Sequence, residues 1–280
     1  MSDRLIYFFW EGGPMSYLRY MTLFSFKKYN PGWTVRLVSK ESSTPSVATW
    51  GTEERQDFTS YFGEDYSSRC AGIGVEQIDF DISYNGLLPD SMSPIHRKDL
   101  LNWYIMGTEQ CVVADMDILF ISSLTSEFSR FIDSGVELGL VCFPGVPRAG
   151  YVPISIMFSN RSEYAFRLFR SGLERYDPLV YESCGSVLLD EDMPRRINSG
   201  EVFRINEKII FPHTTYFSFG DSMNYMYKWR VANIDEASTC GIHWYAGNPA
   251  SQKFNSMITE STYRDFNNTM TYYIEKAINA

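Results

Sequence analysis

The sequence predicts an α/β protein with a Rossmann-like central sheet, mixed but mostly parallel, flanked by helices in a single domain over residues 1–280. Three observations predict this. The apolar run 5–10, a helical pattern and the strand-like run 33–38 together form a βαβ signature, which implies parallel strands. A second apolar run, rich in β-branched residues, spans Cys111–Ile121. A chain of 280 residues with 44% hydrophobic and 16% aromatic residues can bury a substantial core.

Turn and cap residues set the bounds of the first elements. Pro14 suits the first position of a helix over 15–29, which Asn30-Pro31-Gly32 ends before the strand at 33–38. Residues 40–68 are polar and predict a loop with a short helix. Ser93-Pro94 supplies the N-cap and first position of the next helix, which Gly107 closes.

The second half of the chain continues the alternation. Apolar runs predict strands at 137–143 and 152–159, followed by a helix over 162–176. Residues 201–211 predict a strand or a hairpin, and 263–277 a terminal amphipathic helix. The sequence has no internal repeat and no linker-like stretch, so one domain is the simplest prediction.

Composition and charge exclude several classes of partner. Twenty-five basic and 34 acidic residues give a net charge of −9, which argues against duplex nucleic acid or an anionic membrane as the main partner. The apolar start is too short for a signal peptide, and no run is long enough to span a bilayer. The five scattered cysteines lack CxxC spacing and predict reduced thiols. We therefore expect a soluble, cytoplasmic protein with at most peripheral membrane association.

Two carboxylates, Asp115 and Asp117, interrupt the apolar run 111–121. Unpaired buried acids are costly, so we expect the strand to end near Ala114 and to deliver both acids to the carboxyl edge of the sheet. Ligands of open α/β sheets bind at that edge. Two hard oxygen ligands suit Mg²⁺ or Mn²⁺ carrying nucleotide phosphates. A β-turn in which Asp115 caps the next segment is the structural alternative.

Two further segments carry candidate ligands. On the helix that Ser93 begins, Asp99 and Asn102 share a face suited to sugar hydroxyls, and basic residues near the helix start suit a phosphate. A solvated helix start is the structural alternative. His243 stands among glycines and aromatic residues in a predicted loop, where a neutral imidazole could complete the coordination shell of an ion.

These segments, in this order, resemble the DXD-containing sugar transferases with the A-type glycosyltransferase (GT-A) fold, a group with eukaryotic mannosyltransferases and bacterial or viral capsule- and glycan-building enzymes. The resemblance spans most of the chain, in patches. The matching segments are Ile6–Gly13 (first strand), Ser25–Trp33 (helix ending in Asn-Pro), Asp99-Leu100-Leu101 (helix before the DXD strand), Asp115-Met116-Asp117 (the DXD) and His243-Trp244 (carboxyl-terminal His).

The resemblance implies a hexosyltransferase of polysaccharide biosynthesis that uses Mn²⁺ or Mg²⁺. It would move a sugar, with retention, from a UDP-sugar or, as second choice, a GDP-sugar to a glycan or other hydroxyl acceptor. The donor would bind in the half 1–125 and the acceptor in 126–280. The implied site residues are Asp99, Asp115 and Asp117 for catalysis; Phe9, Trp10 (stacked on the base), Arg97, Asp99, Asn102, Asp115 and Met116 for the nucleotide-sugar; Asp115, Asp117 and His243 for the metal; and Trp244, Asp190 and Asp192 on the acceptor side.

Two departures from the family pattern keep alternatives open. Asn102 stands where the family usually has Arg, and the usual Gly-Gly before the DXD strand is reduced to Gly107-Thr108-Glu109. A catalytically degenerate protein of the same fold that binds nucleotide or glycan is therefore one alternative. A phosphatase of the haloacid-dehalogenase kind is another, because it also uses Asp-x-Asp after a strand. That chemistry requires a Lys between its motifs, and none occurs between Lys98 and Lys208.

Overall fold

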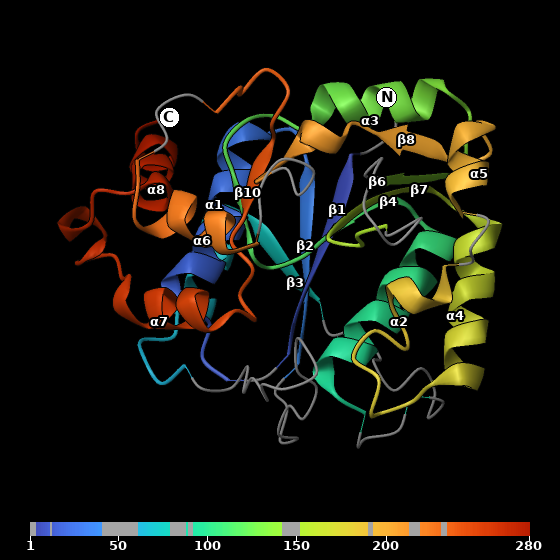
Figure 1. Cartoon of the computed structure of the whole chain (residues 1–280), viewed down its shortest axis with the longest axis horizontal. Coiled ribbons are helices and arrows are strands. Elements are labelled where there is room, and N and C mark those ends of the chain that lie inside the picture. Colours follow the sequence, from blue (N-terminus) through green and yellow to red (C-terminus); the bar gives the residue numbers. More distant parts are fainter. Residues whose placement is uncertain are drawn as a thin grey trace.

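A seven-stranded sheet forms the centre of the molecule (Figure 1). A computed structural model describes residues 4–11, 13–40, 61–78, 88, 92–141, 152–189, 193–212, 219–230 and 234–280. The strand order is β3-β2-β1-β4-β7-β6-β8, and within this sheet only β7 runs against the others. The predicted α/β fold with a mixed, mostly parallel sheet is therefore confirmed. The strands are β1 (Leu5–Glu11), β2 (Thr34–Lys40), β3 (Val75–Ile78), β4 (Gln110–Ala114), β6 (Leu138–Val141), β7 (Ile156–Asn160) and β8 (Phe203–Ile205).

The predicted βαβ unit opens the chain. β1 pairs in parallel with β2 from Leu5↔Thr34 to Glu11↔Lys40, and helix α1 (Tyr17–Tyr29) connects them. The Ser16 side chain accepts from the Arg19 N–H and caps this helix, and the Asn30 N–H closes it on the Phe26 carbonyl.

Both faces of the sheet are covered, as alternation along its strands requires. Ile6 and Phe8 of β1 enter one core, whereas Leu5 and Tyr7 enter the other. Figure 1 shows α1 and α8 on one side of the sheet and α2 and α4 on the other. The α-helices that follow α1 in the described residues are α2 (Pro94–Thr108), α3 (Thr125–Asp133), α4 (Glu163–Arg175), α5 (Met193–Asn198), α6 (Phe219–Tyr227), α7 (Pro249–Met257) and α8 (Thr269–Asn279).

A small second sheet was not expected from the sequence. Its order is β5 (Ile118–Phe120), β10 (Gly241–His243) and β9 (Ile210–Phe211). The single strand or hairpin expected over 201–211 is therefore wrong. β8 pairs with β6 of the large sheet and β9 pairs with β10 of the small one, with a 3₁₀ turn (Glu207–Ile209) between them.

Cap residues explain where the predicted helix bounds hold and where they shift. Ser93 caps α2 as expected, and Ser162, expected as the first residue of the next helix, is the N-cap of α4. The terminal helix begins at Thr269 instead of 263, because Asn268 and Thr271 form a capping box there. Of the expected loop at 40–68, residues 41–60 lie outside the described part. Among the described residues, no helix combines the length and apolarity needed to cross a membrane.

Candidate functional site

The acid pair follows the end of β4, as predicted. β4 ends at Ala114, and its neighbours are β1 on one side and β7 on the other. The Asp115 N–H donates to the Ser155 carbonyl at 2.9 Å, and the Thr22 hydroxyl donates to the Met116 carbonyl at 3.1 Å. The turn is therefore held by the backbone of Ser155, just before β7, and by the side chain of Thr22 on α1, which leaves both carboxylates at the carboxyl edge of the sheet.

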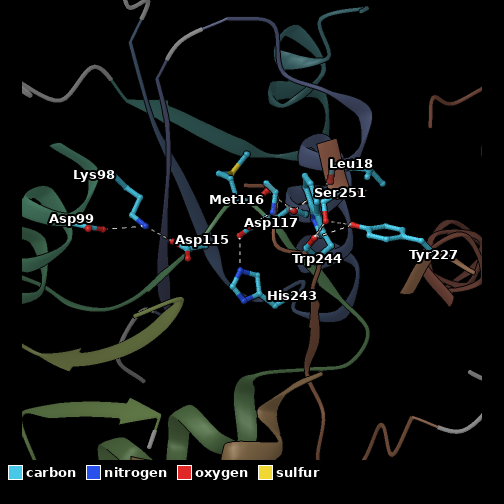
Figure 2. Close-up of polar contacts among 12 residues, drawn as sticks. Leu18, Lys98, Asp99, Asp115, Met116, Asp117, Tyr227, His243, Trp244 and Ser251 are labelled. Carbon is cyan, nitrogen blue, oxygen red and sulfur yellow. Dashed lines mark hydrogen bonds and ion pairs between the residues drawn. The ribbon is translucent and has the colours of Figure 1, made fainter. Parts of the chain in front are cut away.

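The small sheet brings His243 to this acid pair. β5 and β10 pair antiparallel, which sets His243 opposite Ile118, the residue after Asp117. Gly241 permits the close approach, because a Cβ there would lie 2.5 Å from Ile118 Cγ2. His243 Nε2 lies 3.2 Å from Asp117 Oδ1 (Figure 2). Ligand atoms of Asp115, Asp117 and His243 all lie within 4.8 Å of one another.

Asp117 is held as a carboxylate. Its Oδ2 accepts from the Ala246 N–H at 2.8 Å, after the chain reverses at Tyr245 with a φ of 50°. A left-handed non-glycine residue is a strained feature of the kind found at functional sites. Burial alone would raise the pKa of Asp117, but His243, Arg19 and the Ala246 N–H hold it below its usual range. Asp117 in turn raises the pKa of His243 against the effect of burial.

A buried lysine joins the two halves of the predicted site. Lys98 Nζ lies 2.6 Å from Asp115 Oδ1 and 3.2 Å from Asp99 Oδ1, and Figure 2 shows the ammonium between the two acids. Burial would lower the pKa of Lys98, but both carboxylates raise it. Burial raises the pKa of Asp99 to about 6 and also raises that of Asp115, in spite of Lys98.

Arg97 does not face this cluster. Its Nε lies 3.3 Å from Glu11 Oε2, and both side chains are almost fully buried, at 3% and 2% exposed. Its guanidinium also donates to the Met92 carbonyl at 2.8 Å. Of the two basic residues at the start of α2, Lys98 is therefore the one beside the acids.

Trp10 and Trp244 both lie close to Arg19, a residue that the sequence analysis did not single out. The Arg19 guanidinium lies 4.5 Å from the Trp10 ring centroid and 5.5 Å from that of Trp244. The Trp10 indole N–H donates to the Gly13 carbonyl at 3.2 Å. Arg19 belongs to no motif, and its place in α1 gives no sequence signal that it reaches the acid pair.

The segment 177–188 covers the Asp99 side of the site. Two bonds fix it to α2: His96 Nε2 pairs with the Val180 carbonyl and the Trp103 indole donates to the Cys184 carbonyl, each at 2.9 Å. Burial raises the pKa of Tyr181, and Lys98, Asp99 and Asp115 are near enough for their charges to act on its phenol. Sequence reasoning missed Tyr181, because it lies in no motif.

Gly185→Ala is expected to lower the free energy of unfolding by about 1–3 kcal/mol, the usual cost of overpacking. A Cβ at Gly185 would lie 2.5 Å from Asp99 Oδ2 and 3.0 Å from Ile154 Cδ1, so the acid or the segment must move. Urea unfolding measures the change. Gly32→Ala is the matched control, since nothing lies within 4 Å of its Cβ. Equal stability of the two variants would show that the segment yields without cost.

The other predicted residues take varied places. Phe9 is partly buried at the end of β1, and Asn102 is buried on α2. Met116 is buried, and its carbonyl accepts the hydrogen bond from the Thr22 hydroxyl that holds the turn. Trp244 is fully buried and lies near Arg19, and its place on the acceptor side stays a prediction. Asp190 and Asp192 lie outside the described residues.

The donor set at the end of β4 fits a divalent cation. Two carboxylates and one imidazole are hard and borderline ligands of the kind that Mn²⁺ accepts, while an imidazole is less suited to Mg²⁺. Asp117 is ionised, as a metal ligand must be. The residues that would hold the ion are Asp115, Asp117 and His243.

No protein-family model and no curated protein matches the chain. Similar solved structures include the PaToxG glycosyltransferase (11% identity, 98% of this chain, 87% of that chain, TM-score 0.47). The galactosyltransferase LgtC with donor and acceptor sugar analogues is similar at 13% identity, over 94% of this chain and 100% of that chain, with a TM-score of 0.47. Mouse xyloside xylosyltransferase 1 is similar at 12% identity, over 74% and 87%, with a TM-score of 0.41. Matches of this size leave function to be argued from the site itself.

Proposed function

We propose that this protein is a metal-dependent glycosyltransferase that moves a sugar from a nucleotide diphosphate donor to a hydroxyl acceptor, with a UDP-sugar as the first choice of donor. The observation that carries the proposal is the convergence of Asp115, Asp117 and His243 at the carboxyl edge of the sheet. This edge is the place where α/β sheets bind ligands, and the acid pair stands in the DXD pattern. We propose retention of configuration from the sequence resemblance alone.

The residues of the site suit this reaction by charge. A divalent ion held by the triad supplies positive charge to offset that of a leaving diphosphate. Asp99 and Asp115, both oriented by Lys98, present acceptors suited to sugar hydroxyls. Trp10, at the end of β1, offers an aromatic face to a base. With these groups fixed by the sheet edge, positioning supplies much of the rate.

A thermal-shift panel of UDP-, GDP- and other nucleotide-sugars, with and without Mn²⁺, tests the proposal. A donor that binds raises the melting temperature by linkage, and we expect the shift to need Mn²⁺. Donor hydrolysis or transfer is then assayed with the sugar that shifts most. Binding without turnover would favour the degenerate alternative that Asn102 suggests. Release of phosphate from simple phosphomonoesters would favour the phosphatase.

Trp10→Ala is expected to weaken nucleotide binding by about 1–3 kcal/mol, the usual scale for a base stacked on an aromatic side chain. Isothermal titration with the nucleoside diphosphate that the wild type binds measures the change. Trp229→Ala is the control, because this residue is 49% exposed and packs against Tyr225 at the end of α6. Equal affinity of Trp10→Ala and wild type would exclude the stacking role.

A further inference from the structure

Arg19 is the cation that the candidate site leaves without an assigned partner. It belongs to α1, is half-buried, and lies near the indoles of both Trp10 and Trp244. Trp10, where we place the base, is the penultimate residue of β1, and Trp244 directly follows the metal-site residue His243. The guanidinium is therefore close both to the proposed base platform and to the acids of the proposed ion site.

Both indoles lie within cation–π distance of the Arg19 guanidinium. Stacking on aromatic rings uses the plane of the guanidinium, whereas its five N–H donors point outward in that plane. Within the described part of the chain, no oxygen accepts a hydrogen bond from the Arg19 side chain and no carboxylate forms an ion pair with it. Asp117 and Asp115 nevertheless lie near enough to act on its charge.

Among the residues that the structure describes, the other basic side chains near the acids are already engaged. Arg97 pairs with Glu11, and Lys98 bridges Asp99 and Asp115. Asn102, where the resembling family has an arginine, carries no charge. A leaving diphosphate needs compensation beyond one divalent ion, and a planar fork of donors is well matched to phosphate oxygens.

We infer that Arg19 is a diphosphate-binding residue, which replaces from α1 the positive charge that is missing at position 102. This inference rests on the proposed function and adds a residue that the DXD pattern does not contain. The guanidinium donates hydrogen bonds to the phosphate oxygens between the base at Trp10 and the ion at Asp117. Because the two indoles hold it in place, little side-chain entropy is lost on binding.

Isothermal titration of the full chain tests the inference with three probes: UDP or GDP, whichever the wild type binds, the matching nucleoside, and inorganic pyrophosphate. We expect Arg19→Gln to weaken the affinity for the nucleoside diphosphate and for pyrophosphate by about 10- to 100-fold. The affinity for the nucleoside should stay within about twofold of the wild-type value. Arg19→Lys keeps the charge but loses the fork, so its loss should be smaller. Arg130→Gln is the control, since that exposed arginine pairs with Glu127 on α3.

The outcomes separate this inference from the proposed function. A wild type that binds and turns over a nucleotide-sugar, with diphosphate affinity unchanged in Arg19→Gln, would overturn the inference alone. An equal loss for nucleoside and diphosphate would also overturn it, because Arg19 would then only support Trp10. A wild type that binds no nucleoside diphosphate would overturn both. Where the nucleoside binds too weakly to measure, the pyrophosphate titration decides, and where Arg19→Gln does not fold, Arg19→Lys decides.

Discussion

Asp117→Asn is expected to abolish metal-dependent turnover, with a loss of at least about 100-fold, while the fold stays intact. The amide removes the negative charge that faces His243 and would face a divalent ion. Asp115 cannot replace this charge, because its carboxylate is already paired with Lys98. The substituted side chain keeps an oxygen that can accept from the Ala246 N–H, so the turn after β10 retains its support. Initial rates of donor hydrolysis or transfer with Mn²⁺ measure the loss.

Titration of Mn²⁺ itself gives a second readout for Asp117→Asn that does not depend on turnover. Metal affinity should fall in the variant and stay unchanged in Asp133→Asn, an exposed acid at the end of α3. Full turnover in Asp117→Asn, or unchanged Mn²⁺ affinity, would remove this acid from the metal site. A loss of both activity and folding would show a structural role instead.

Local rules account for the parts of the fold that the sequence predicts well. The βαβ unit at 5–40 follows from apolar periodicity and from the turn residues around Pro14 and Asn30. The end of β4 before Asp115 follows from the cost of burying acids in a strand. The proximity of Lys98 to Asp115 could have been predicted from the sequence, because α2 leads directly into β4.

Other features depend on contacts between distant segments, which local patterns do not encode. The pairing of β5 with β10 joins residues more than a hundred positions apart. Strands of three residues are too short to show the alternation of apolar and polar residues that predicts a strand. Arg97 and Lys98 are neighbours in sequence, yet Glu11 engages only the first of them. Arg19 lies near Trp10 and Trp244 only through the packing of α1, which the sequence of α1 does not encode. The single-domain assignment and the split into donor and acceptor halves stay predictions.

Lys98→Met is expected to lower the free energy of unfolding by about 3 kcal/mol near pH 8, the scale for breaking a buried ion pair by removing one partner. The Lys98 side chain is 21% exposed, and those of its partners Asp115 and Asp99 are 19% and 4% exposed, so water does not fully replace the ammonium. Methionine keeps the volume of the side chain, so the change reports charge more than packing. Urea unfolding in EDTA measures it, with Lys228→Met, an exposed residue after α6, as the control.

The deficit of Lys98→Met should shrink as the pH falls from 8 to 5. The pKa of Asp99 is already raised to about 6 by burial with Lys98 present, and the loss of the ammonium raises it further. In the unfolded chain Asp has a pKa near 3.9 and stays ionised at pH 5. Because the pKa of Asp99 is higher in the folded state, the folded protein takes up a proton that the unfolded chain does not. Stability therefore rises for both proteins as acid is added, but it rises more for the variant, because its Asp99 pKa lies further above the unfolded value, and the deficit shrinks. A deficit that stays constant from pH 8 to 5 would show that Asp99 and Asp115 find another counter-charge, and Lys98 would then have no part in setting their protonation.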